Sequence, residues 1–298
     1  MNVVVTGGLG FIGQAIVREL LIRRHRVTIV DYWKDRITEY ERARYPILEE
    51  IYADSLSVRE YIEPQEFLHR VKGMAVDVVI HAGAVVDTMD LGDRGLWEAN
   101  VDYTRDLCAG LMPRSIPLVF MSSAAVYGKA GHPANPYGLS KLIGEKFVSE
   151  LTRYAILRLF NVFGPLEHHK GVMSSVPFKL AQAYKDVSRF EMHSPDSSRD
   201  FVPVAAVVRV AVERAEHLTS KHVSNEIYDV GTGESTTFGD LDAMIQQAVR
   251  ANHSVVKVIP MPEHLVGRYQ FYTRADSPRR PDMTDFSTRQ WINEYFKR

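Results

Sequence analysis

Short apolar runs alternate with longer stretches in which apolar residues recur at helical spacing, throughout roughly the first half of the chain. Ile16, Val17, Leu20 and Leu21, for example, fall on one face of a helix. Strands alternating with helices of this length predict an α/β fold with a doubly wound parallel sheet. The runs that predict buried strands are residues 2–5, 26–30, 51–54, 76–80, 117–121 and 154–160.

The alternation breaks after residue 160, where the chain becomes rich in turn residues, histidine and serine. A strand-like segment returns at residues 225–230. We therefore expect residues 1–160, completed by about 203–230, to form the sheet domain, and residues 161–202 and about 231–298 to form a smaller lobe. Ligands of such folds bind outside the carboxyl ends of the strands, which places the expected site between the two parts.

Composition narrows the classes of function. The 298 residues include 36 Lys and Arg against 37 Asp and Glu, so the net charge of −1 provides no basic surface for nucleic acid or for a membrane. The single cysteine, Cys108, excludes an internal disulfide framework and a cysteine-based zinc site. With neither a long apolar run nor a leader-like start, a cytoplasmic protein is expected.

The glycine-rich segment at residues 6–13 separates the first predicted strand from the first predicted helix. Gly7, Gly10 and Gly13 have the spacing at which a backbone approaches a pyrophosphate that sits at the helix N-terminus. An acidic residue, Asp31, follows about 20 residues later, as dinucleotide-binding (Rossmann) folds require. A tight turn without a ligand is the less favoured interpretation.

The residues after the second strand leave the choice of dinucleotide open. Asp31 would accept hydrogen bonds from a ribose and favours NAD, whereas Lys34 or Arg36 could neutralise a 2′-phosphate and favours NADP. Asp54 is placed to meet the edge of the adenine ring, and the small residues after His81 suit a loop beneath the cofactor. The further expected cofactor contacts are Phe11, Ile12, Tyr32, His81, Ala82, Gly83, Ala84, Asn100, Tyr137, Lys141 and Val162.

Tyr137 and Lys141 are four residues apart on a predicted helix, and therefore lie on one face. A nearby ammonium favours the phenolate, so Lys141 is expected to lower the pKa of Tyr137. Tyr137 then becomes a candidate general acid and base, while Lys141 can also hold the nicotinamide ribose. Ser122 and Ser123 end the fifth strand, where a hydroxyl can bond the substrate oxygen or simply cap the strand end.

Together these parts resemble the extended short-chain dehydrogenase/reductase family. The resemblance implies that Ser123 is the catalytic serine. Members that remove water from nucleotide sugars carry an Asp-Glu pair directly after this serine, whereas this chain has Ala124 and Ala125. Reduction or epimerisation, without elimination, is therefore expected.

Three further stretches, residues 161–176, 199–203 and 262–276, are similar to the ADP-L-glycero-D-manno-heptose 6-epimerases. The resemblance implies that Lys170 is a second catalytic base. His168 and His169 could be metal ligands, but no third ligand has suitable spacing, so no metal is expected. It further implies substrate contacts, with Arg199 suited to a diphosphate unless an ion pair with Asp196 or Asp200 engages it. The expected substrate contacts are Ser122, Asn161, Lys170, Arg199 and Tyr269.

The chemistry implied by this resemblance is oxidation of the heptose at C6 to a ketone, rotation, and return of hydride to the opposite face. Tyr137 would serve one epimer and Lys170 the other. The cofactor, NADP or NAD, would be tightly held and recycled, and a homo-oligomer is implied. The alternatives are a 4-epimerase or 4-reductase of another nucleotide sugar, or a sensor of the cofactor without turnover.

Overall fold

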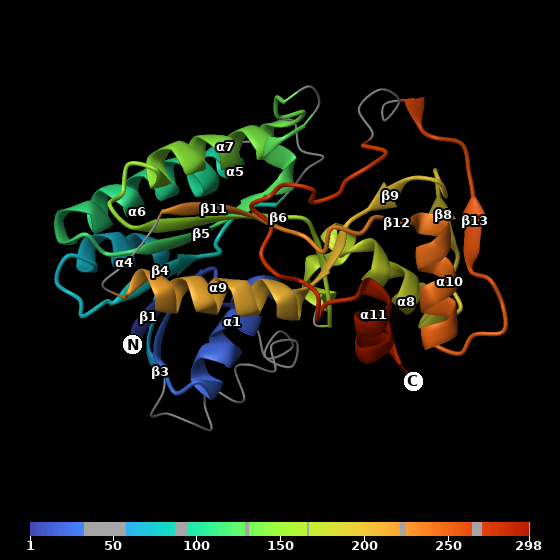
Figure 1. Ribbon diagram of the computed structural model, residues 1–298, viewed down its shortest axis with the longest axis horizontal. Coiled ribbons are helices and arrows are strands. Elements are labelled where there is room, and N and C mark those ends of the chain that lie inside the picture. The colour runs from blue at the N-terminus through green and yellow to red at the C-terminus, as the bar shows by residue number, and fades with distance from the viewer. Residues whose placement is uncertain are drawn as a thin grey trace. The chain divides into compact units, whose positions relative to one another are not determined.

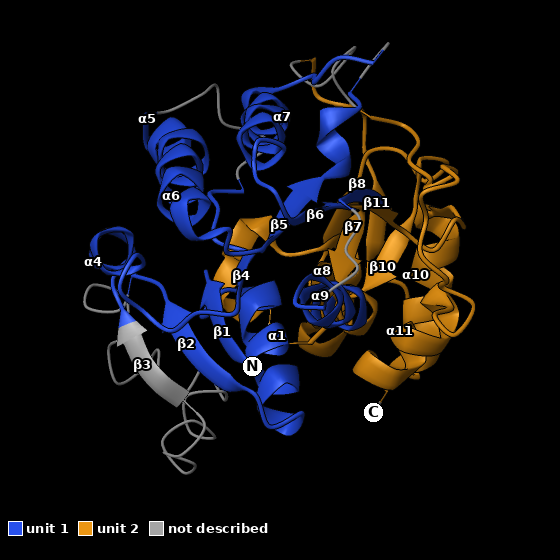
Figure 2. Cartoon of the chain, turned by 60° about the vertical axis from the view of Figure 1, so that its left-hand side comes forward, with its two compact units in different colours: residues 1–158, 208–228 blue, residues 159–207, 229–298 orange. Residues whose placement is uncertain are grey.

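The structure, a computed structural model, describes residues 1–32, 58–86, 94–128, 131–165, 167–220, 225–263 and 270–297. The chain divides into two compact units, shown in Figure 2. Unit 1 comprises Met1–Arg158 and Val208–Tyr228, and unit 2 comprises Leu159–Val207 and Asp229–Arg298. The boundaries expected from the sequence were residues 160, about 203 and about 230, and the division at Arg158, Val208 and Tyr228 lies close to them. That one part binds the cofactor and the other the substrate stays a prediction.

Unit 1 is built on a seven-stranded sheet among the described residues, in the order β11-β6-β5-β4-β1-β2-β3. The pairings from β5 to β3, whose registers are described, are all parallel. The run at 51–54, expected to be the third strand, lies outside the described residues, and β3 is the strand beside β2. The strands are β1 (Asn2–Thr6), β2 (Arg26–Val30), β3 (Val58–Ile62), β4 (Val78–His81), β5 (Leu118–Ser123), β6 (Tyr154–Leu159) and β11 (Glu226–Val230).

Helices lie on both faces of this sheet, with α6 and α7 on one side and α1 and α9 on the other (Figure 1). This arrangement confirms the predicted α/β fold with a doubly wound sheet. The buried core beneath α6 and α7 includes Phe120, Leu107 and Cys108. The helical elements are α1 (Phe11–Ile22), α4 (Pro64–Arg70), α5 (Arg94–Trp97), the π-helix Glu98–Asp102, α6 (Tyr103–Leu111), the short turns Met112–Arg114 and Ala124–Val126, α7 (Pro136–Val148) and α9 (Val204–Leu218).

Unit 2 combines short strand pairs with helices around its own apolar core, which includes Phe163, Phe201, Leu241 and Ile292. The strands pair as β7 (Asn161–Phe163) with β10 (Phe201–Pro203), β9 (Ser198–Arg199) with β12 (Thr236–Thr237), and β8 (Phe190–Met192) with β13 (Val256–Val258). The helical elements are the turn His168–Met173, α8 (Val176–Asp186), α10 (Phe238–Ala248) and α11 (Thr288–Phe296). No helix in the described part of the chain is long and apolar enough to cross a membrane.

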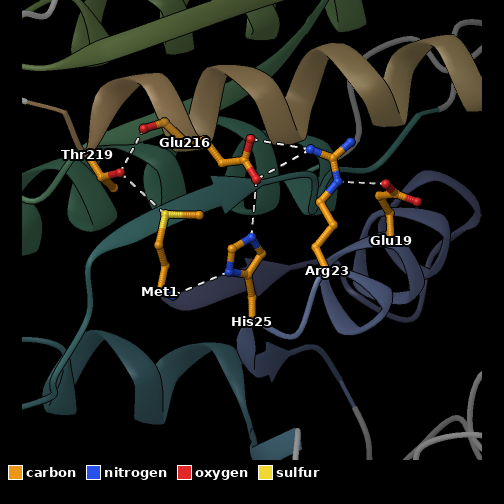
Figure 3. A network of polar contacts seen from close by, with 6 residues as sticks. All are labelled: Met1, Glu19, Arg23, His25, Glu216 and Thr219. Atoms are coloured by element: carbon orange, nitrogen blue, oxygen red, sulfur yellow. Dashed lines mark hydrogen bonds and ion pairs between the residues drawn. The ribbon is translucent and has the colours of Figure 1, made fainter.

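A polar network joins α9 to the turn between α1 and β2, at the amino ends of the strands (Figure 3). The Glu216 carboxylate accepts from Arg23 and from His25, both at 3.3 Å, and the Met1 ammonium lies 3.3 Å from His25 Nδ1. The glycine turn at the other end of β1 lies at the carboxyl edge of the sheet. The network therefore fastens α9 at the edge opposite the expected cofactor site.

Replacing Glu216 tests how much this network stabilises the fold. The ion pairs are partly exposed, so Glu216→Ala should lower the free energy of unfolding by about 1 kcal/mol or less. Urea denaturation gives this difference, with Glu213→Ala, an exposed site on the same helix, as the matched control. A loss several times larger would show that α9 depends on the network for its docking.

Candidate active site

The turn between β1 and α1 has the geometry that a dinucleotide pyrophosphate requires. A side chain at position 13 would place its Cβ 1.9 Å from the Gly7 carbonyl oxygen, so only glycine lets the helix begin this close to the strand. Gly10 caps α1 without a side-chain hydrogen bond, which leaves the N–H groups of the first turn, including those of Phe11 and Ile12, for an anionic ligand. These residues therefore fit the cofactor.

Asp31 ties the end of β2 to the glycine turn. Its Oδ2 accepts from the Leu9 N–H at 2.9 Å and its Oδ1 from the Tyr32 N–H at 2.8 Å. The carboxylate also helps to raise the pKa of Tyr103, a buried phenol that the sequence did not identify, although burial is the larger cause. Lys34, Arg36 and Asp54, which bear on the dinucleotide choice, lie outside the described residues.

His81 and Asn100 act inside the protein. His81 bonds the hydroxyls of Thr6 at 2.5 Å and Thr104 at 3.0 Å, and burial lowers its pKa to about 3, which keeps the ring neutral. Asn100, in the π-helix, exchanges hydrogen bonds with the Val85 backbone at 2.8 and 2.9 Å. Asn100 thus holds the end of the loop of Ala82, Gly83 and Ala84, His81 fixes the hydroxyls at its start, and the contacts of these residues with the cofactor stay a prediction.

Local sequence explains why Tyr137 meets Ser123. The Asn135 side chain caps α7 by accepting from the Gly138 N–H at 2.8 Å, which sets Tyr137 in the first turn of the helix. A Cβ at Gly138 would lie 2.5 Å from the Ala125 carbonyl oxygen, so glycine allows α7 to begin against the segment after Ser123. The Ser123 and Tyr137 side chains lie beside each other, and the hydrogen bond with Ser123 acts to lower the pKa of the phenol.

The prediction that Lys141 lowers the pKa of Tyr137 is wrong, because the pKa of this phenol is raised. Burial raises the pKa of Tyr137, and the hydrogen bond with Ser123 only partly opposes this rise. Lys141 is itself 4% exposed, and its Nζ donates to the Met121 carbonyl oxygen at 2.9 Å. Burial lowers the pKa of Lys141 to about 8, so its ammonium is destabilised by the same desolvation that disfavours the phenolate.

Glu145, one turn after Lys141, was missed by the sequence reasoning. Its carboxylate accepts from Arg158 Nε at 2.9 Å, from Arg158 Nη2 at 2.7 Å and from Ser122 Oγ at 2.5 Å. Ser122 is therefore buried and bonded within the protein, and its predicted contact with the substrate stays a prediction. The spacing of four residues from Lys141 on an apolar helix face was the available signal.

Asn161 and Arg199 lie on neighbouring short strands of unit 2. Asn161 Nδ2 donates to the Asp200 carbonyl oxygen at 3.1 Å and to Thr273 Oγ1 at 2.9 Å. Arg199 is mostly buried, donates to backbone carbonyl oxygens of Ser198 and Gln270, and lies over the Phe238 ring. The other expected residues are Val162, which lies in β7, and Tyr269, which lies outside the described residues.

Asp200, which the sequence offered as an ion-pair partner for Arg199, has a different role. Its buried carboxylate accepts from the N–H groups of Thr232 at 2.9 Å, Gly233 at 2.9 Å and Ala275 at 3.0 Å. Three segments of unit 2 therefore converge on one carboxylate beside Arg199. This hub was not predicted, because its donors come from distant parts of the chain.

Lys170 lies in the turn His168–Met173, and its Nζ is 2.9 Å from an oxygen of Glu167, a completely buried carboxylate. The sequence identified Lys170 but not its partner. The structure thus brings Ser123, Tyr137 and Lys141 together within unit 1, and places Lys170, Asn161 and Arg199 within unit 2.

A glycine turn that fits a dinucleotide, followed by a partly buried serine beside a buried tyrosine and lysine, defines the class of α/β enzymes that transfer hydride with a nicotinamide cofactor. The chain belongs to the NAD dependent epimerase/dehydratase family, whose model matches residues 3–231. It is accordingly an enzyme of the epimerase type.

Individual relatives agree with this assignment. The chain is 33% identical to an ADP-L-glycero-D-manno-heptose-6-epimerase of Alkalilimnicola ehrlichii, with 92% of this chain and 88% of the relative covered. A crystal structure of the ADP-L-glycero-D-manno-heptose-6-epimerase of Helicobacter pylori shares the fold, with a TM-score of 0.79, 21% identity and coverage of 99% and 94%. A UDP-N-acetylglucosamine 4-epimerase from Methanobrevibacter ruminantium has a TM-score of 0.77, 23% identity and coverage of 99% and 96%.

The buried pair of Glu145 and Arg158 should matter for folding. Glu145→Gln keeps the shape but leaves the Arg158 guanidinium without its charged partner, and should destabilise the protein by about 3–5 kcal/mol. Urea denaturation measures this loss, with Glu150→Gln, an exposed site just after α7, as the matched control. A loss no greater than that of the control would show that the pair is not needed to hold α7 against β5 and β6.

Proposed function

We propose that this protein epimerises ADP-D-glycero-D-manno-heptose at C6 to ADP-L-glycero-D-manno-heptose. The observation that carries the substrate is the 33% identity to an enzyme of that name over 92% of the chain. The site supports the reaction type, because Ala124 and Ala125 follow the catalytic serine and supply no acid or base for eliminating water. Hydride chemistry with proton transfer at one oxygen remains.

Each residue has a chemical task in this proposal. When bound, a nicotinamide dinucleotide accepts a hydride from C6 and returns it to the opposite face of the ketone. Tyr137 exchanges a proton with the C6 oxygen in one orientation, and Ser123 orients that oxygen by a hydrogen bond. After rotation about the exocyclic bond the oxygen points elsewhere, and Lys170 exchanges the proton there. Asn161 and Arg199 contribute to binding the sugar nucleotide.

A 4-epimerase or 4-reductase of another nucleotide sugar would need only Ser123, Tyr137 and Lys141. The fold shared with a UDP-N-acetylglucosamine 4-epimerase is compatible with this alternative. Lys170 separates the two proposals, since a second proton-transfer group matters only where the oxygen is presented in two orientations. A protein that only senses the cofactor, without turnover, would need neither Tyr137 nor Lys170 as a proton-transfer group.

Incubation with ADP-D-glycero-D-manno-heptose, without added cofactor, should yield the L-glycero epimer. We expect Tyr137→Phe and Lys170→Ala each to lower kcat by about 10²-fold or more, because each removes one proton-transfer group. Chromatography of the ADP-heptoses measures the conversion, and Lys185→Ala, an exposed lysine of α8, is the matched control. Full activity of Lys170→Ala would contradict the mechanism with two groups.

We propose that the bound cofactor is NAD rather than NADP. Asp31 places a carboxylate at the end of β2, where it would accept hydrogen bonds from the hydroxyls of a ribose diol and would repel a 2′-phosphate. Mass spectrometry of the nucleotide released by denaturation identifies the cofactor, and Asp31→Asn should narrow any preference for NAD in thermal-shift titrations. Release of NADP would show that Lys34 or Arg36 outweighs Asp31.

A further inference from the structure

The Glu167 carboxylate is 0% exposed and is held by four donors within unit 2. Oε1 accepts from the Gly164 N–H at 3.1 Å and from Ser175 Oγ at 2.7 Å. Oε2 accepts from the Ser175 N–H at 2.7 Å and from Lys170 Nζ at 2.9 Å. These four hydrogen bonds satisfy both oxygens of the carboxylate, which offsets part of the cost of burying it.

Hydrogen bonds to the backbone of Glu167 fix the position of the Lys170 backbone. The Lys170 N–H donates to the Glu167 carbonyl oxygen at 2.9 Å, and Ser174 Oγ donates to the same oxygen at 3.0 Å. Ser175 also caps α8 by accepting from the Phe178 N–H at 3.3 Å. Glu167 thus joins the turn that carries Lys170 to the N-terminus of a regular helix, where negative charge is favoured.

Lys170 is more buried than an ordinary surface lysine, since its side chain is 19% exposed. A buried ion pair carries a desolvation cost that often cancels its attraction, so stability alone gives little reason for this arrangement. Lys179 of α8 is the second cation near the carboxylate. Burial lowers the pKa of Lys179, and the charge of Lys170 lowers this pKa further, whereas the charge of Glu167 opposes the decrease. Of these two lysines, Lys170 makes the direct bond to Glu167.

We propose that Glu167 is the positioning residue of the second proton-transfer site, which holds the Lys170 side chain in place and in its ammonium form so that it acts as a proton donor. This inference rests on the proposed epimerase function. Glu167 is completely buried and acts only through Lys170, so it is not itself expected to touch the substrate.

In the reducing step, C6 of the ketone accepts hydride from the reduced nicotinamide, and the C=O π pair moves onto oxygen. That oxygen takes a proton from Lys170 Nζ, so an N–H bond breaks as the O–H bond forms. The amine left behind is neutral and faces the Glu167 carboxylate, which favours its return to the ammonium. In the opposite direction the neutral amine accepts the same proton.

The protonation of Lys170 can be measured without any substrate. Only a neutral amine reacts with acetic anhydride, so competitive acetylation of the folded protein near neutral pH, read by peptide mass spectrometry, reports the neutral fraction at each lysine. Glu167→Gln should increase the labelling of Lys170 by about tenfold, the effect expected for loss of an adjacent opposite charge. Ser175→Ala keeps the carboxylate and should stay within about twofold of wild type, with Lys185 as the internal standard.

A control at high pH separates loss of charge from opening of the turn. Near about pH 12, above both the ordinary lysine pKa and one raised enough to give a tenfold difference in labelling, lysine amines are largely neutral in every variant, so the difference at Lys170 should shrink. A difference that persists there would mean that Glu167→Gln only exposes Lys170, and this result would overturn the proposal. Unchanged labelling near neutral pH would overturn it as well.

Kinetics with ADP-D-glycero-D-manno-heptose complete the test. Glu167→Gln should lower kcat by about tenfold or more with little change in KM, and Glu167→Asp should recover part of the loss because it restores the charge. Increased labelling with an unchanged kcat would refute the role of Glu167 in catalysis. Absence of turnover in the wild-type protein would instead refute the proposed function, while the labelling would still decide whether Glu167 holds Lys170 charged.

Discussion

The ion pair between Glu145 and Arg158 is the interaction on which the geometry of unit 1 depends. It joins α7 to β6 through two charge-assisted hydrogen bonds, and Ser122 at the end of β5 donates to the same carboxylate. Arg158 also reaches the Tyr127 hydroxyl at 2.8 Å, beyond the turn that follows Ser123. Three elements, of which α7 and β5 carry the candidate catalytic side chains, are therefore fastened at one buried point.

The two lysines of the proposed mechanism each have a buried carboxylate nearby, yet their surroundings differ. The charge of Glu145 is compensated by Arg158, so burial dominates at Lys141 and lowers its pKa to about 8. Glu167 instead bonds Lys170 directly, and it also accepts from the uncharged N–H groups of Gly164 and Ser175 and from the Ser175 hydroxyl. Arg158 therefore shares the carboxylate near Lys141, whereas Lys170 is the direct cationic partner of its own carboxylate.

The features that sequence predicted correctly are those encoded locally. The glycine turn and the spacing of Tyr137 and Lys141 are determined by a few consecutive residues, and alternating apolar runs indicated the doubly wound sheet. The contacts that sequence missed join distant residues: Ser122 to Glu145, and Asp200 to Thr232 and Ala275. The pKa of Tyr137 was misjudged for the same reason, since spacing on a helix shows that a cation is near but not how deeply both groups are buried.

In the proposed mechanism, each unit holds its proton-transfer group near its own buried carboxylate. Within unit 1, Glu145 is satisfied by Arg158 and Ser122, and within unit 2 the donors to Glu167 come from Gly164, from Lys170 in the following turn and from Ser175, which caps α8. The contacts that hold Lys170 therefore lie within unit 2, and the contacts that hold the helix of Tyr137 lie within unit 1. An epimerase that presents one oxygen in two orientations requires two such groups, and constructing them from separate contacts allows the protonation of each to be set independently.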